Sequence, residues 1–161
     1  MKRRLMLGMS LLAAGLGLLA GCSNAPESSF TTVKGERIEL SALRGRPVLV
    51  TFWASNCASC LDEMPRLTEL YRDYHARGLE VIAVAMQYDM PSQVVALATQ
   101  RDLPYPVVLD PQGQHAHAFE DVTVVPSVFL LSPEGDIRFR KIGPPDMKAL
   151  RSMINSMLAE T

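Results

Sequence analysis

Two apolar runs, residues 48–53, interrupted only by Thr51, and residues 81–86, most constrain how this chain can fold. Both are rich in β-branched side chains and carry no charge, which is typical of strands covered on both faces of a parallel or mixed sheet. The segment between them repeats apolar residues at helical spacing and ends at Gly78, so it predicts one long amphipathic helix. Pro65 lies inside this helix and cannot donate to the carbonyl of Leu61, so we expect a kink there.

The rest of the chain continues this alternation and then changes it. Residues 92–101 predict a helix and residues 107–109 a third strand, and such alternation implies right-handed crossovers. Residues 127–131 and 136–142 flank a Ser-Pro-Glu-Gly turn and predict an antiparallel hairpin. Residues 145–158 predict a last helix whose apolar stripe, methionines included, packs in the core. The predicted fold class is α/β, a central mixed sheet with helices on both faces and a C-terminal antiparallel hairpin plus helix.

Two cysteines, Cys57 and Cys60, stand where the first of these strands ends and the long helix begins. A helix N-terminus offers free N–H groups and the positive end of the helix dipole, which lower the pKa of a thiol there. Residues three apart lie on one helix face, with Cβ atoms about 5–6 Å apart, close enough for a disulfide. We therefore predict a redox pair in which Cys57 is the nucleophile and Cys60 the resolving thiol. An inert disulfide or half a zinc site is the alternative, but zinc usually needs four ligands.

The first 21 residues predict an export leader. Three basic residues precede an apolar stretch over 5–20, as in a secretory signal, and this stretch is short and glycine-interrupted for a bilayer span. The run that ends at Cys22 resembles the bacterial lipobox, whose cysteine becomes the lipidated first residue. An uncleaved anchor or a chance cysteine is the alternative. Residues 22–29 would then be a lipidated tether and residues 30–161 the folded domain. An aspartate directly after the lipidated cysteine marks retention at the inner membrane, and this chain has Ser23 there, which favours the outer membrane.

Composition supports a chemical role for the remaining pair of cysteines. The chain has three cysteines, and acylation of Cys22 would account for the odd one in an exported protein. The 140 residues after the leader are enough to bury a core without a disulfide scaffold. Removing the three basic residues of the leader leaves 13 basic against 17 acidic residues, a net charge of −4, which argues against nucleic-acid binding.

The order of these elements resembles the thioredoxin superfamily, and within it the membrane-tethered TlpA/ResA group of thiol-disulfide oxidoreductases. The motifs that carry the resemblance are residues 52–54, residues 57–65 with the Cys-x-x-Cys, and residues 125–130. The resemblance implies a thioredoxin-like domain, no cofactor, and reduction of disulfides in other exported proteins, including apocytochrome c during haem attachment. It also implies an upstream membrane thiol donor and a position on the membrane that faces the periplasm.

The resemblance assigns roles to further residues. Glu63 matches an acidic position close to the cysteine pair in ResA-like proteins, and we expect it to be the proton partner of Cys60. Pro126 is expected to be cis, as in the superfamily, which brings the backbone of Val125 beside the cysteines to pair with an extended substrate segment. Trp53 is expected either to shelter the thiols as part of the substrate site or to fill the core.

Three positions depart from the family pattern. Asn56 stands where the family usually has a Trp before the first cysteine, and Ser59 where a Pro commonly precedes the second. Both affect the redox potential, because these residues set how well a thiolate is stabilised at Cys57, but they do not give the direction of the change. Thr51 replaces the buried aspartate of cytosolic thioredoxins, and a hydroxyl cannot take up a proton as a carboxylate can.

Other functions fit the same fold. A thiol peroxidase of the peroxiredoxin kind needs Thr or Ser three residues before its reactive cysteine, where this chain has Ala54. A binding module, either a copper chaperone or a non-catalytic partner holder, is another alternative. Copper carriers of this fold favour a wider cysteine spacing and a histidine ligand, and no histidine directly follows Cys60. His115 and His117 could chelate a metal, but imidazoles in a polar loop are usually only exposed, so no metal site is predicted.

Overall fold

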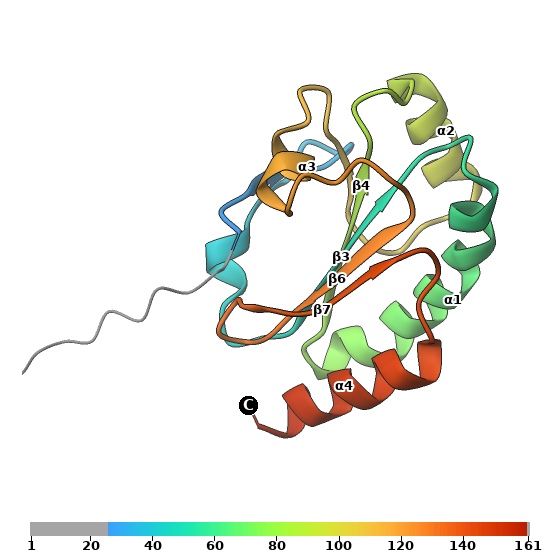
Figure 1. The fold of residues 1–161 in the computed structure, drawn as a ribbon. Helices are drawn as coiled ribbons and strands as arrows, with labels where there is room; N and C mark the ends of the chain where they lie inside the picture. The colour runs from blue at the N-terminus through green and yellow to red at the C-terminus, as the bar shows by residue number, and fades with distance from the viewer. Residues whose placement is uncertain (1–25, 161) are drawn as a thin grey trace, which may run out of the picture.

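A five-stranded mixed sheet forms the centre of the computed structural model, which describes residues 26–160 (Figure 1). Its strands lie in the order β5-β4-β3-β6-β7, with β3 parallel to β4 and antiparallel to β6. Their bounds are β3 Val48–Trp53, β4 Glu80–Ala85, β5 Val107–Leu109, β6 Ser127–Leu131 and β7 Ile137–Ile142. The middle strand, β3, is buried at every residue, as its apolar run predicts.

The predicted leader over residues 1–21 lies outside the described residues, as do Cys22 and Ser23. The first described strand, β1 (Ser29–Thr31), begins one residue before the predicted start of the folded domain. Within residues 26–160, no helix has the length and apolar character needed to cross a bilayer.

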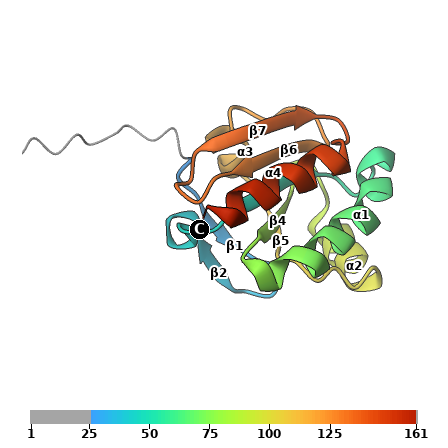
Figure 2. The ribbon, with the colours of Figure 1, turned by 90° about the horizontal axis from the view of Figure 1, so that it is seen from below.

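The long helices cover one face of the sheet. They are α1 (Ala58–Tyr74), which the short 3-10 helix η2 (His75–Arg77) follows, α2 (Pro91–Gln100) and α4 (Met147–Ala159). Both crossover helices, α1 and α2, lie on this face because the strand order steps in one direction from β3 to β4 to β5. α4 lies beside α1 (Figure 2) and buries Leu150, Ile154 and Met157 in the same core, which confirms the prediction for its apolar stripe.

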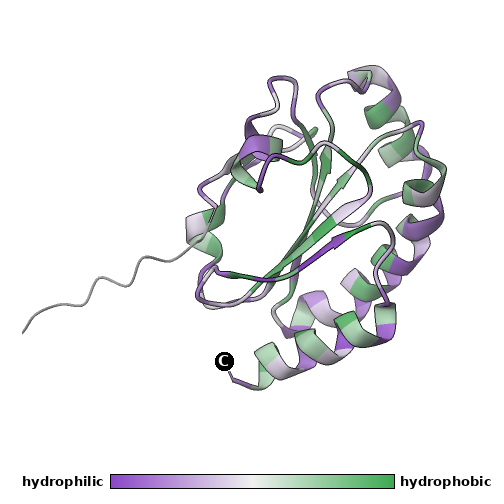
Figure 3. Ribbon diagram, viewed as in Figure 1, coloured by the Kyte–Doolittle hydropathy of each residue, from purple (hydrophilic) through white to green (hydrophobic). Residues whose placement is uncertain are grey.

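Shorter elements that the sequence pattern did not predict cover the opposite face. They are the hairpin of β1 and β2 (Arg37–Glu39), the 3-10 helix η1 (Leu40–Leu43) and α3 (Gln114–Ala118). Phe30, Phe52, Phe119 and Phe129 meet in this layer with ring centroids 5.3 to 6.4 Å apart. Helices therefore lie on both faces, as expected, but unequally. Figure 3 shows the inner strands β3, β4 and β6 as apolar and β7 as largely polar.

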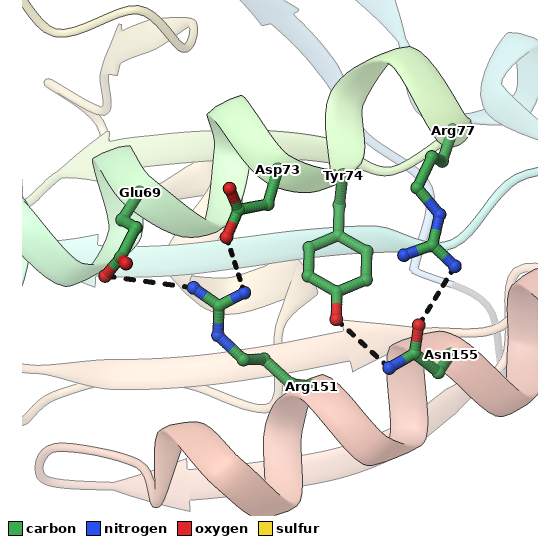
Figure 4. A network of polar contacts seen from close by, with 6 residues as sticks. All are labelled: Glu69, Asp73, Tyr74, Arg77, Arg151 and Asn155. Carbon is green, nitrogen blue, oxygen red and sulfur yellow. Dashed lines mark hydrogen bonds and ion pairs between the residues drawn. The ribbon is translucent and has the colours of Figure 1, made fainter.

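Polar side chains join α1 and η2 to α4 outside the core (Figure 4). The network consists of Glu69, Asp73, Tyr74, Arg77, Arg151 and Asn155. Arg151 donates to Asp73 at 2.7 Å, and Asn155 donates to the hydroxyl of Tyr74 at 3.0 Å. Because the carboxylates of Glu69 and Asp73 are exposed and Arg151 is partly so, each ion pair is worth about 1 kcal/mol or less, and the apolar contacts of α4 hold most of its packing energy.

α1 continues through Pro65 instead of ending there. The proline leaves the carbonyl of Leu61 without its usual helical donor. Arg101, the residue that follows α2, donates its Nη1–H to this carbonyl at 3.2 Å. The neighbouring helix therefore satisfies the acceptor that the proline leaves free, directly after Cys60.

Candidate active site

Three segments of the chain meet at one end of the sheet. β3 ends at Trp53, and a short turn leads to Cys57, which is the N-cap residue of α1. On the other side of β3, strand β6 begins at Ser127, which pairs with Phe52. Pro126, directly before β6, therefore reaches the same end of the sheet as the two cysteines.

Cys57 and Cys60 form a disulfide, with their Cα atoms 5.2 Å apart. The N–H of Cys60 donates to the Sγ of Cys57 at 3.2 Å, and the hydroxyl of Ser59 lies 3.5 Å from the same sulfur. Cys57 is partly exposed, whereas Cys60 is only 3% exposed. The first turn of α1 thus directs a backbone donor at the sulfur that a partner can reach, which supports the prediction that Cys57 is the nucleophile.

Glu63 lies one turn further along α1, and its side chain is almost completely removed from water. The residue is 1% exposed, and its Oε1 has no hydrogen-bond partner among the described residues. Burial raises the pKa of Glu63 to about 7, while the charge of Arg66 acts in the opposite direction. Glu63 and Cys60 line the same small cavity. A carboxyl that titrates near neutral pH beside a buried thiol is suited to exchanging a proton with it.

The remaining walls of this cavity include the proline loop and the neighbouring strands. The peptide bond between Val125 and Pro126 is cis, as predicted, and Pro126 lines the cavity together with Cys60. Thr51 lines it too, so a hydroxyl lies where cytosolic thioredoxins carry a carboxylate. Val125 is partly buried against the core beside it.

Trp53 lines the cavity from β3 and is 2% exposed. Its indole Nε1 has no hydrogen-bond partner within residues 26–160. Trp53 belongs to the buried core and also lines the cavity beside Cys60, so its burial fits both expected roles, and its place in the substrate site stays a prediction.

Known proteins share this fold and are similar to the chain in sequence. Residues 23–140 match the AhpC/TSA family. The solution structure of a candidate thioredoxin from Neisseria meningitidis has a TM-score of 0.80 and 27% sequence identity to this chain. The match covers 86% of this chain and 92% of the Neisseria chain. The crystal structure of a candidate thiol:disulfide interchange protein DsbE from Chlorobium tepidum has a TM-score of 0.76 and 28% sequence identity to this chain. The match covers 84% of this chain and 96% of the Chlorobium chain. The thiol-disulfide oxidoreductase ResA of Bacillus subtilis (strain 168) is 33% identical over 124 residues, which are 77% of this chain and 68% of the relative.

The chain belongs to the ResA-type thiol-disulfide oxidoreductases of the AhpC/TSA family. The prediction of a thioredoxin-like fold with a Cys-x-x-Cys redox pair is therefore confirmed. Against this family background, Asn56 is exposed in the turn before the disulfide, and Ser59 is exposed within its first helical turn. Both departures from the family pattern thus lie on the open side of the pair.

A pair of contacts that sequence reasoning missed holds the active-site turn of this ResA-type protein. Asp89, in the loop after β4, accepts hydrogen bonds from the N–H and the hydroxyl of Ser55, both at 2.5 Å. The two residues are far apart in the sequence and belong to no shared motif. Only the topology could have predicted this contact. Ser55 follows the end of β3 and Asp89 follows the end of β4, and the two strands are parallel neighbours.

The two histidines considered as metal ligands lie on α3, on the face of the sheet opposite the long helices. His115 packs against Phe30 with tilted rings whose centroids are 4.6 Å apart, and burial lowers the pKa of His115. His117 contacts the carboxylate of Asp121 at 2.5 Å. Residues 26–160 contain no group of three or more His, Cys, Asp or Glu side chains that could hold a metal ion. His115 thus packs against an aromatic ring and His117 contacts a carboxylate, each within its own surroundings.

Proposed function

We propose that this ResA-type oxidoreductase is exported, is lipidated on Cys22 and reduces disulfides in other exported proteins. The charged and apolar leader, the lipobox-like run that ends at Cys22 and the ResA relatives support this proposal. The lipid would hold the domain at a membrane facing the periplasm, and Ser23 favours the outer membrane. Client proteins would include apocytochrome c before haem attachment, and a membrane thiol donor would restore the reduced pair.

The proposed cycle transfers two electrons to the client. In the reduced protein, the Cys57 thiolate attacks one sulfur of the client disulfide, and the other client sulfur leaves as a thiolate. Cys60 then loses its proton and attacks the Cys57 sulfur, which breaks the mixed disulfide and releases the second client thiolate. Both client thiolates take protons from water or from the protein, and the protein is left with the Cys57–Cys60 disulfide seen in this structure.

Glu63 serves the second step of this cycle. Cys60 is buried, so its proton has no direct exit to water. The carboxylate of Glu63 accepts this proton, because both groups line one cavity and the pKa of Glu63 lies near 7. Cis-Pro126 lies beside the same cavity, which leaves the backbone of Val125 available to pair with the client segment.

The observation that carries the proposal is the unequal exposure of the two sulfurs. Cys57 is open to a partner, and Cys60 is buried beside a carboxyl of raised pKa. This difference supports attack by Cys57 and resolution by Cys60, the two separate roles that thiol-disulfide exchange through a mixed disulfide requires.

Trapping tests this function in cells. A Cys60→Ala variant cannot resolve the mixed disulfide, so Cys57 is expected to remain bonded to client proteins that mass spectrometry can identify. The Cys57→Ala, Cys60→Ala double variant is the matched control and should trap none. Failure of a folded, exported Cys60→Ala protein to form any adduct would contradict the mechanism, and a measured potential at the strongly oxidising end would reject the reductase direction.

A further inference from the structure

Exposed apolar side chains gather at the end of the sheet that carries the disulfide. Among the described residues, four large apolar side chains at this end are more than half exposed: Tyr88, Met90, Val124 and Ile142. The first two follow β4, the third precedes cis-Pro126, and Ile142 pairs with Ser127 at the start of β6. Val95 on α2 is the other exposed apolar residue of this size and lies outside these loops.

Hydrogen bonds hold the backbone that carries two of these apolar side chains against the turn before the redox pair. Asp89 stands between Tyr88 and Met90 and accepts from both donors of Ser55, two residues before Cys57. The same carboxylate accepts from the N–H of Met90 at 2.9 Å. One side chain therefore ties the loop after β4 to the turn that carries the reactive cysteine.

The loop on the other side of the disulfide is held in a similar way. The hydroxyl of Ser127 donates to the carbonyl of Val124 at 2.6 Å. The N–H of Gly143, next to Ile142, donates to the carbonyl of Pro126 at 2.8 Å. Both loops thus present apolar side chains from anchored backbone, which lowers the entropy that a docking partner has to remove.

We propose that Asp89 is a positioning residue that holds Tyr88 and Met90 near the turn of Cys57. There the two side chains form a docking surface for an extended client segment that has apolar side chains next to the client cysteine. The inference rests on the proposed function, because a client must bring its sulfur into bonding distance of Cys57. Whatever flanks the client cysteine then covers the side chains around Cys57. Besides the polar Asn56 and Ser59 next to the pair, those side chains include exposed apolar ones on both sides of the disulfide, so burial rewards apolar client residues over charged ones.

Two symmetric peptide disulfides of equal length test this surface. In one, Leu and Val flank the cysteine, and in the other Ser and Gln do, so the attacked sulfurs differ only in their neighbours. The reduced protein is mixed with each peptide, and released peptide thiol is followed by chromatography. The wild-type protein is expected to reduce the apolar peptide about tenfold faster, roughly the effect of burying two methylene groups.

Variants separate docking from general damage to the fold. Tyr88→Gln with Met90→Gln, and separately Asp89→Ala, are each expected to lower the ratio of the two rates to about twofold or less. Val95→Gln is the matched control and should keep the wild-type ratio, since Val95 is exposed on α2. A change that only loosened the fold would lower both rates together and leave their ratio unchanged.

Four results would overturn the inference or its premise. A wild-type protein with equal rates for the two peptides has no apolar docking surface at this end. A tenfold ratio that survives in the Tyr88→Gln, Met90→Gln variant would place the preference elsewhere, and one that survives in Asp89→Ala would remove the positioning role. A wild-type protein that reduces neither peptide would instead contradict the proposed function.

Discussion

Replacing Glu63 with glutamine is expected to remove a pH dependence of stability that burial of this carboxyl causes. Burial raises the pKa of Glu63 from the ordinary 4.5 to about 7 in the folded protein. Between these two pH values the unfolded chain has lost the proton and the folded protein still holds it. The folded state therefore binds more protons, and the free energy of unfolding falls as the pH rises through this window.

The size of the effect follows from the same two pKa values. One pKa unit corresponds to about 1.4 kcal/mol, so the rise from 4.5 to about 7 lowers the free energy of unfolding by about 3 kcal/mol at pH 8. Near pH 4 both states are protonated and the penalty is absent. Glu63→Gln has nearly the same shape and cannot ionise, so it should be more stable than wild type at pH 8 by about 2–3 kcal/mol and differ little at pH 4.

Urea unfolding of the oxidised protein between pH 4 and 8 measures this difference, with the fluorescence of the single tryptophan, Trp53, as the signal. The pKa of His115 is lowered by burial, which destabilises the fold as the pH falls, but both proteins share this contribution and it cancels. Asp62→Asn is the control, because Asp62 is exposed on the same helix. Equal slopes for wild type and Glu63→Gln between pH 5 and 7 would refute the reasoning.

The same variant has a chemical consequence. Without the carboxylate, the proton of Cys60 has no acceptor in the cavity, and resolution of the mixed disulfide is expected to slow by about a hundredfold or more. Rapid mixing of reduced protein with a peptide disulfide separates the two steps. Attack by Cys57 should change much less, because Cys57 reaches solvent directly. An unchanged resolution rate would remove Glu63 from the mechanism while leaving the stability prediction intact.

Two further predictions concern packing and the choice of substrate. Leu150→Ala empties a fully buried position of α4 and should lower the free energy of unfolding by about 2–5 kcal/mol. Arg151→Ala removes a partly solvated ion pair and should lower the same free energy by about 1 kcal/mol or less. Urea unfolding measures both changes. Peroxide consumption should be slow, because buried Ala54 provides no hydroxyl three residues before Cys57; turnover comparable to disulfide reduction would favour the peroxidase alternative.

The central sheet could be predicted because its strands are buried on both faces. The run over β3 has no charged residue and ends in a turn, and the structure places the strand over the same six residues. The opposite layer could not be predicted. β1 and β2 have only three residues each, too few to show an alternating pattern, and Phe30 packs against distant rings, those of His115 and Phe119, rather than against its own neighbours in the sequence.

The site shows the same division between local and distant contacts. The nucleophile, its helix N-terminus and the acidic residue one turn later all lie within seven residues, so spacing brings Cys57, Cys60 and Glu63 together before any tertiary contact is known. Asp89 lies outside this range, since its contact with Ser55 depends on the register of β3 and β4. The carbonyl of Leu61 is a further case, because the sequence predicts that Pro65 frees it but not that Arg101 satisfies it.

One turn of helix explains how a single short motif supplies two different environments. α1 begins at the surface and runs across the sheet, so the N-cap residue Cys57 stays near solvent and Cys60, three residues later, is already in the core. Attack needs an accessible sulfur, while resolution needs a partner carboxylate that is basic enough to accept a proton near neutral pH, and Glu63 has that property only because burial raises its pKa. Polar substitutions that hydrate the cavity would therefore lower the pKa of Glu63 and weaken resolution before they affect attack.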